Sequence, residues 1–179
     1  MNFYGVIKFW FHEVEPKQRW LKDSEFDQRV KAQFAMFHRS ARRCELVAWR
    51  QSALGRLSEI IILDQFSRNM YRGHPESFAQ DPLALALAQE AVNAGIGPEL
   101  TPDQRSFLYM PFMHSESALI HQQAVKLFSE PGLEDNLKYE IKHKMIIDRF
   151  GRYPHRNEIL GRTSTVEEQQ FLAQPGSSF

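Results

Sequence analysis

Residues 54–70 would be apolar around most of their circumference if they formed a helix. Two neighbouring rows share helical spacing, and their members are Leu54, Leu57 and Ile61 in one row and Ile60, Leu63 and Phe66 in the other. A helix with apolar residues on most of its sides has to be covered by other elements on those sides. We therefore predict that this segment is the central and most buried helix of the protein.

The rest of the chain also carries helical signals. Apolar residues recur at spacings of three or four in two further segments, namely Phe26, Val30, Phe34 and Phe37, and Leu137, Ile141 and Met145. No clear alternation of apolar and polar residues lies between hairpin turns, which argues against a β fold. Short connections favour antiparallel neighbours. The sequence thus predicts one all-α domain over residues 1–179, built from stacked antiparallel helix pairs.

Several helix ends can be predicted from capping residues. Asp81 followed by Pro82 is typical of a cap and the first helical position after it. Pro111 should kink or end the helix that contains it, and Ser115 should then cap the next helix. Gly151 should close a helix in the left-handed conformation.

Charge and cysteine content exclude several classes of function. Lysine and arginine number 22, as do aspartate and glutamate, so no net positive charge is available to hold nucleic-acid phosphates. Cys44 is the only cysteine, which rules out an internal disulfide and a multi-thiolate metal site within one chain. No apolar run approaches the roughly 20 residues that cross a bilayer, and Lys8 interrupts the apolar start, which makes a poor signal peptide. We expect a cytosolic protein without nucleic-acid or membrane partners, and its oligomeric state is left open.

The first candidate constellation lies in residues 63–73. Asp64 stands inside an apolar run, and Arg68 follows one helical turn later, so the two side chains can meet. One interpretation is a half-buried acid that Arg68 or a helix end satisfies, because buried charges are usually paired. The other places Arg68, Asn69 and Arg72 at the mouth of a pocket, where they would bind an anion.

The second candidate constellation is His114 and Glu116, just beyond Pro111. An imidazole and a carboxyl group at a turn entering a helix could serve acid–base chemistry. The alternative is purely structural, with Ser115 as a cap and Glu116 in the first helical turn.

The third candidate constellation lies in residues 149–157, around a glycine and a proline. Its polar members are Arg149, Arg152, His155, Arg156 and Asn157. Arginine forks bind carboxylate or phosphate groups through two hydrogen bonds, and residues 142–162 contain six Lys or Arg against two acids. The alternative is that these arginines cap helix ends and pair with acids elsewhere.

A metal centre is not expected. Glu140 and His143 form one Glu-x-x-His motif, whereas a carboxylate-bridged dimetal bundle needs two such motifs and two further glutamates. The sequence also contains no Gly-rich phosphate loop, no GxSxG elbow and no HExxH motif. We therefore expect neither a metal nor a cofactor.

Five longer motifs span nearly the whole chain, and together they resemble the family called domain of unknown function 924. They are FWF at 9–11, ELVAW at 45–49, IILDQFSRNMYRG at 61–73, FLYMPFMHSE at 107–116 and RFGRYPHRNEILGR at 149–162. The resemblance implies a tetratricopeptide-like α-α superhelix, but it implies no activity. Ser67 departs from the family motif, in which proline would be expected. The polar parts of these motifs coincide with the three candidate constellations.

Three hypotheses about function follow. The favoured one is a binding or scaffolding module whose arginines and histidines line a pocket for a small anionic molecule or an acidic peptide. The second is an enzyme on an anionic metabolite, in which Arg68, Arg152 and Arg156 orient the substrate and His114, Glu116 or His155 moves protons. The third is a buried polar network that only fixes how the helices pack.

Overall fold

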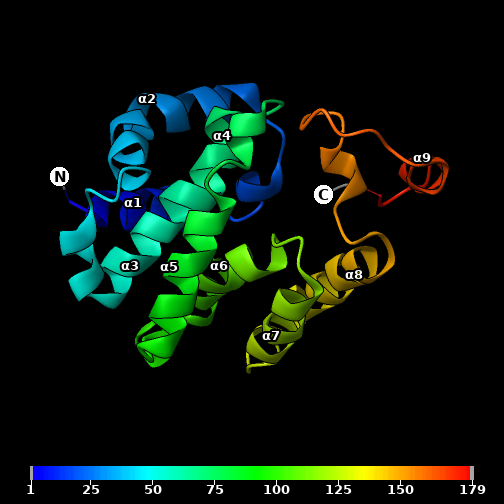
Figure 1. The fold of residues 1–179 in the computed structure, drawn as a ribbon. Helices are drawn as coiled ribbons and strands as arrows, with labels where there is room; N and C mark the ends of the chain where they lie inside the picture. The colour runs from blue at the N-terminus through cyan, green and yellow to red at the C-terminus, as the bar shows by residue number, and fades with distance from the viewer. Residues whose placement is uncertain (1, 178–179) are drawn as a thin grey trace.

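The computed structural model describes residues 2–177, and every regular element in that range is helical (Figure 1). The α-helices are α1 (Tyr4–Lys8), α2 (Ser24–Ala41), α3 (Ala53–Ile61), α4 (Ser67–Met70), α5 (Asp81–Asn93), α6 (Pro102–Met113), α7 (Ala118–Phe128), α8 (Glu134–Phe150) and α9 (Val166–Leu172). One π-helical segment, η1 (Phe9–Glu13), directly follows α1, and a second, η4 (Ile62–Phe66), joins α3 to α4. The predicted all-α class is confirmed.

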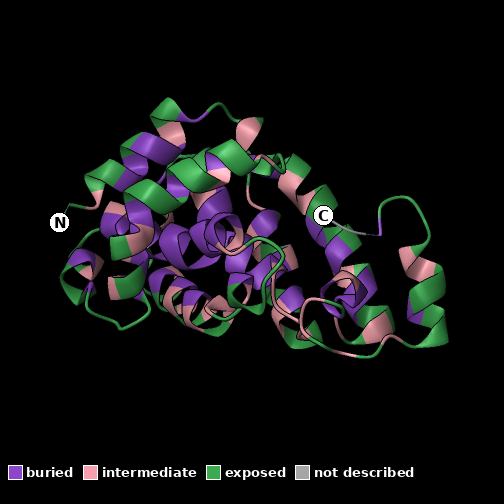
Figure 2. Ribbon diagram, turned by 90° about the horizontal axis from the view of Figure 1, so that it is seen from above, coloured by how far each residue is buried: buried purple, intermediate pink, exposed green. Residues whose placement is uncertain are grey.

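The predicted central helix is also confirmed. Helices α3 and α4 and the π-helical turn η4 between them form one uninterrupted run, and residues 60–63 within it are fully buried. This run packs against α2, α5 and α6, and Figure 2 shows the buried residues gathered in the interior of the molecule. Ser67, at the start of α4, donates its hydroxyl to the carbonyl of Leu63 at 2.6 Å and lies 2.8 Å from Nε2 of His38 on α2.

Helices that follow one another in the chain pack side by side from α5 to α8. Ala84, Ala88 and Ala91 are fully buried on α5, and such small side chains let its neighbours approach closely. Within residues 2–177, none of the helices combines the length and the apolar composition that crossing a bilayer requires. The tetratricopeptide-like superhelix and the single domain over 1–179 stay predictions.

The hydrophobic residues form two groups. The larger one is built mainly by the elements from α1 to α7, whereas a small one contains Ile146, Ile147 and Tyr153, with Phe150 and Phe171 packed against it. Helices α8 and α9 lie toward one side of the molecule in Figure 1. Residues 149–157, the third stretch singled out from the sequence, include Phe150 and Tyr153 of the smaller group.

Three predicted helix ends differ from the structure. Gln80, not Asp81, is the N-cap residue of α5, and the Asp81 carboxylate binds arginines from other segments. Helix α6 continues through Pro111 to Met113, so Pro111 does not end it, and the alternative of a kink stays a prediction. The N-cap of α7 is Ser117 rather than Ser115.

Helix α8 presents a different face to the core from the one that its apolar spacing indicates. Ile141 and Met145 are 42% and 65% exposed, so the predicted stripe through them is wrong. Glu140 and His143 are buried instead. One oxygen of Glu140 bonds His121, and His143 bonds the Tyr139 carbonyl, which offsets part of the cost of burial. Among the described residues, the second Glu140 oxygen has no hydrogen-bond partner. Gly151 closes the helix with φ 68°, as predicted.

Candidate functional site

Asp64 lies in the π-helical turn η4, and its side chain is only 1% exposed. Single π-turns inside α-helices occur frequently at functional sites. The carboxylate accepts from Nδ1 of His114 at 2.7 Å and from Nε2 of Gln65 at 2.6 Å, and it lies 3.1 Å from Nη1 of Arg68. Burial alone would raise the pKa of Asp64, but Arg68 and His114 hold this pKa below its ordinary value. The carboxylate is therefore a buried, ionised anchor.

His114 follows the last residue of α6 and is the partner that Asp64 orients. Its side chain is 15% exposed. Because the ionised carboxylate can only accept, Nδ1 carries the proton and Nε2 on the other side of the ring is unprotonated in the neutral imidazole. Burial and the nearby Arg68 lower the pKa of His114. The arrangement thus presents a neutral imidazole held in one tautomer.

Asp81 connects two arginines from distant segments. Arg68 donates to both of its carboxylate oxygens at 3.0 Å, and Nη1 of Arg156 donates to one of them at 3.1 Å. Nη2 of Arg156 also donates to the carbonyl of His114 at 3.0 Å. We call Asp64, Arg68, Asp81, His114 and Arg156 the polar cluster. Two aspartates balance its two arginines, so with His114 neutral it carries no net charge.

Two aromatic rings lie against the Arg156 guanidinium. Its carbon lies 4.5 Å from the centre of the Phe78 ring and 4.8 Å from that of the Tyr153 ring. Arg68 shares the Phe78 ring at 5.7 Å. Such stacking suits a guanidinium, which is planar and weakly hydrated. Arg156 is thereby buried, and its position is fixed by the protein itself.

Glu116 fastens the segment after α8 to the end of α6. Its two oxygens accept from Arg162 at 2.7 and 2.9 Å, and one of them also accepts from the backbone N–H of Tyr153 at 2.7 Å. These contacts lower the pKa of Glu116 although burial raises it. Both oxygens are occupied, which suits an anchor better than a proton donor. The sequence interpretation did not include Arg162.

Asn69 and Arg72, which were grouped with Arg68 from the sequence, face another partner. Arg72 donates to both carboxylate oxygens of Asp27 on α2 at 2.6 and 2.9 Å, and Asn69 donates to the same carboxylate at 2.8 Å. These bonds join α4 to α2. The structure does not bring the two residues into the polar cluster.

The arginines at the end of α8 likewise have acids of their own. Arg149 donates to Glu167, and Arg152 donates to both oxygens of Glu168, which belong to α9. Asn157 is buried; its amide nitrogen donates to the Ser164 hydroxyl, and its carbonyl oxygen accepts from Nε of Arg162. Of the three arginines predicted in this stretch, only Arg156 reaches the polar cluster.

His155 lies close to the polar cluster, against Tyr153. Their ring centres are 5.5 Å apart. Burial and Arg156 lower the pKa of His155 to about 4, so its imidazole is neutral at neutral pH. His121 and His143 also lie against the Tyr153 ring, at 6.2 and 5.7 Å. The candidate acid–base residues His114, Glu116 and His155 are therefore found in one region of the molecule.

A second imidazole–carboxylate pair, which the sequence interpretation missed, lies deeper. His121 on α7 and Glu140 on α8 are both fully buried, and Nδ1 lies 2.7 Å from the carboxyl oxygen. Nε2 of His121 faces the carbonyl of Ser115 at 2.8 Å. In the sequence, Glu140 is recognisable only as part of a Glu-x-x-His motif with His143. In the structure, Nδ1 of His143 donates to the carbonyl of Tyr139. In the part of the chain that the structure describes, no three or more His, Cys, Asp or Glu are grouped as a metal site.

Comparison with known proteins identifies the family. The family model described as "Bacterial protein of unknown function (DUF924)" matches residues 6–176. A solved structure, that of the protein of unknown function ATU0120 from Agrobacterium tumefaciens, shares 36% sequence identity over 96% of both chains, with a TM-score of 0.87. No curated protein matches the chain. The chain therefore belongs to the DUF924 family of bacterial proteins, as its motifs indicated.

Proposed function

We propose that the polar cluster is the functional centre of an enzyme and that His114 accepts a proton there from a small bound substrate. The observation that carries the proposal is the 2.7 Å contact between Nδ1 of His114 and the buried carboxylate of Asp64. A carboxylate that holds an imidazole in one tautomer leaves the other ring nitrogen as a proton acceptor. This is the acid–base hypothesis of the sequence analysis, centred on His114.

The electrostatics of the pair support this role. A general base has to be unprotonated at the working pH. Burial and Arg68 lower the pKa of His114, so the imidazole stays neutral below the ordinary histidine pKa of 6.5. Placing an ionised aspartate in a π-helical turn at the centre of the protein is costly unless its partners compensate for it. A function at this position is one reason to retain such an arrangement.

The arginines support a positioning role more than the capture of a free anion. Arg68 and Arg156 already donate to Asp81, so an incoming phosphate or carboxylate would have to compete with that carboxylate. Arg156 also donates to the carbonyl of His114, which fixes the backbone that carries the imidazole. The hypothesis of an arginine-lined pocket for a small anion is therefore the less supported of the two.

Replacement of His114 by asparagine separates a chemical role from a structural one. The asparagine amide can still donate to Asp64, but no basic nitrogen remains where Nε2 was. Diethyl pyrocarbonate, which acylates unprotonated imidazole nitrogens, should modify His114 but not the fully buried His121. The exposed His12 and His74 serve as internal references. Modification of His114 should persist below pH 6.5, because its pKa is lowered.

A substrate screen completes the test. Wild-type protein and His114→Asn are incubated with a mixture of small carboxylates, phosphate esters and neutral carbonyl compounds, and conversion is followed by NMR. The proposal predicts conversion by the wild type that His114→Asn lacks at an unchanged melting temperature. If diethyl pyrocarbonate does not modify His114, or if His114→Asn converts the substrates as well as the wild type does, the third hypothesis of a structural network is supported.

A further inference from the structure

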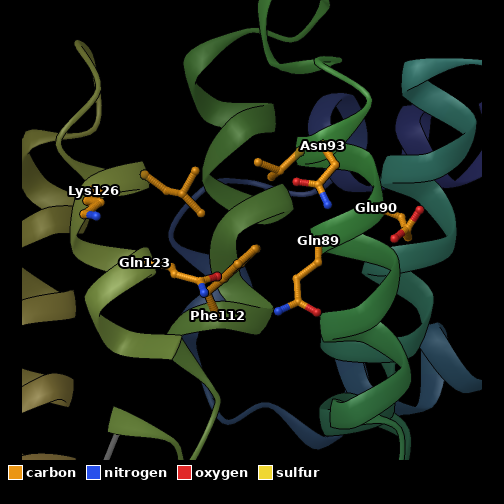
Figure 3. A pocket seen from close by; sticks show the side chains of 8 residues that line it. Gln89, Glu90, Asn93, Phe112, Gln123 and Lys126 are labelled. Carbon is orange, nitrogen blue, oxygen red and sulfur yellow. The ribbon is translucent and has the colours of Figure 1, made fainter. Parts of the chain in front are cut away.

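A groove lies between α5 and α7, away from the polar cluster, with α6 beneath it (Figure 3). The groove is open to solvent, and its volume is about 530 Å³, within the usual range for ligand sites, roughly 300–1,000 Å³. The residues that line it are Gln89, Glu90, Val92 and Asn93 of α5, Phe112 of α6, and Gln123, Lys126 and Leu127 of α7. None of these residues belongs to the polar cluster.

The polar side chains of the groove are exposed or half-buried and are therefore accessible to a ligand. Within residues 2–177, Gln89, Asn93, Gln123 and Lys126 make no side-chain hydrogen bond or ion pair with other protein groups. In Figure 3 the amides of Gln89 and Asn93 lie on the α5 wall across from Gln123 on the α7 wall. The groove thus offers donors and acceptors on two facing sides.

The floor of the groove is apolar. Phe112 is only 2% exposed and lies between the two walls, while Val92 and Leu127 are half-buried. An apolar base with a few convergent polar groups above it is the usual composition of a binding site. A ligand that fits would present apolar groups downward and hydrogen-bonding groups to both sides.

An extended peptide has this pattern. Each of its residues carries one N–H and one C=O, and a primary carboxamide can pair with both because it is a donor and an acceptor. Gln89 and Asn93 are one helical turn apart, a rise of about 6 Å, which is close to two residues of an extended chain, about 6.6 Å. The amides on one wall would therefore meet successive peptide groups on the same edge of the ligand.

The charges at the groove select the ligand further. Lys126 stands on the α7 wall and Glu90 on the α5 wall. A carboxylate would be attracted by Lys126 and repelled by Glu90, so it belongs at the α7 side. We propose that this groove binds an extended peptide segment whose carboxylate, from an acidic side chain or a free carboxyl terminus, contacts Lys126. This inference is independent of the proton transfer proposed for His114.

The test uses three pools of acetylated tetrapeptides, randomised at the first three positions. The first ends in alanine with a free carboxyl group, the second in aspartate with an amidated terminus, and the third in asparagine with an amidated terminus. Binding to the full chain is followed by NMR through the side-chain amide signals of Gln89, Asn93 and Gln123. At least one of the first two pools should shift these signals saturably and bind at least about tenfold more tightly than the third, because a charge-assisted hydrogen bond is stronger than a neutral one. The pool that binds more tightly identifies the source of the carboxylate.

Matched variants locate the contact. Lys126→Ala should reduce binding of the carboxylate pools to the level of the asparagine pool, and Gln89→Ala combined with Gln123→Ala should weaken all binding. Gln122→Ala and Lys31→Ala, at exposed positions outside the groove, should change nothing. The proposal is overturned if no pool shifts the three amide signals, if the asparagine pool binds as tightly as the others, or if Lys126→Ala has no effect. His114→Asn should bind the pools like the wild type, which keeps this test separate from that of the proposed enzyme.

Discussion

His114 donates through Nδ1 to the buried carboxylate of Asp64 at 2.7 Å, although 50 residues separate the two in the chain. The contact joins the end of α6 to the π-helical turn in the central helix. Arg68 shares the same carboxylate at 3.1 Å. Asp64 thus orients the neutral His114 imidazole and pairs with the Arg68 guanidinium.

Asp64→Ala should destabilise the protein by about 3–5 kcal/mol, the usual cost of removing one partner from a buried ion pair. Arg68 would keep Asp81 but lose its second acid, and His114 would lose its orienting acceptor. Urea denaturation followed by circular dichroism measures the change. A loss below about 1 kcal/mol, the size of a surface ion pair, would show that the buried contact contributes little.

Arg156→Ala should be far more damaging than Arg149→Ala. Arg156 is buried against two aromatic rings and bonds Asp81 and the His114 carbonyl, so its loss leaves Asp81 with one partner fewer and should cost about 2–4 kcal/mol. Arg149 is half-exposed beside the exposed Glu167, and such a pair contributes about 0–1 kcal/mol. Equal free energies of unfolding for the two variants would contradict the assigned burial.

The stability of the folded protein should decrease as the pH falls from 6.5 to about 4. Burial lowers the pKa of His38 to about 4, that of His143 to about 3 and that of His155 to about 4. Below 6.5 the unfolded chain therefore binds protons that the folded chain does not, which favours unfolding. Urea midpoints measured across this range should fall steadily, and His143→Gln should flatten the dependence. A midpoint that rises on acidification would show that these imidazoles are charged in the folded state.

Glu140→Gln should be tolerated much better than His121→Ala. Nε2 of His121 donates to the Ser115 carbonyl, and Nδ1 faces an oxygen of Glu140. A neutral imidazole and an ionised carboxylate would leave no proton between Nδ1 and that oxygen, so the pair holds one proton more than this. Burial, which raises the pKa of Glu140, agrees with this arrangement. A glutamine amide can donate to Nδ1 without that proton and should cost about 1 kcal/mol or less. Removing the imidazole strands a buried acid and should cost about 3–5 kcal/mol. Thermal melts of the two variants measure the difference. A lower melting temperature for Glu140→Gln than for His121→Ala would contradict the proposed protonation of the pair.

The part of the fold that local sequence determines could be predicted. The central helix follows from apolar spacing within residues 54–70, and the contact of Asp64 with Arg68 follows from their separation by one helical turn. The buried face of α8 could not be predicted in the same way. Its orientation depends on His121, which lies on another helix and offers Glu140 a partner.

The candidate site was predictable only in part, for the same reason. The sequence indicated His114, Arg68 and Arg156 by their side-chain chemistry, and the structure brings these three together. Asp81 had been assigned to a helix cap, and Arg162 carried no signal of its own. Both residues act across the boundary between packed segments, and no spacing along the chain encodes such a contact.

The protonation state of His114 is the most direct test of the proposed chemistry. A long-range ¹H–¹⁵N correlation spectrum, recorded through a pH titration, reports each ring nitrogen of His114 separately. We expect a neutral ring at neutral pH with the proton on Nδ1, an unprotonated Nε2 and a pKa below 6.5. A ring that is doubly protonated at neutral pH, or that carries its proton on Nε2, would contradict it.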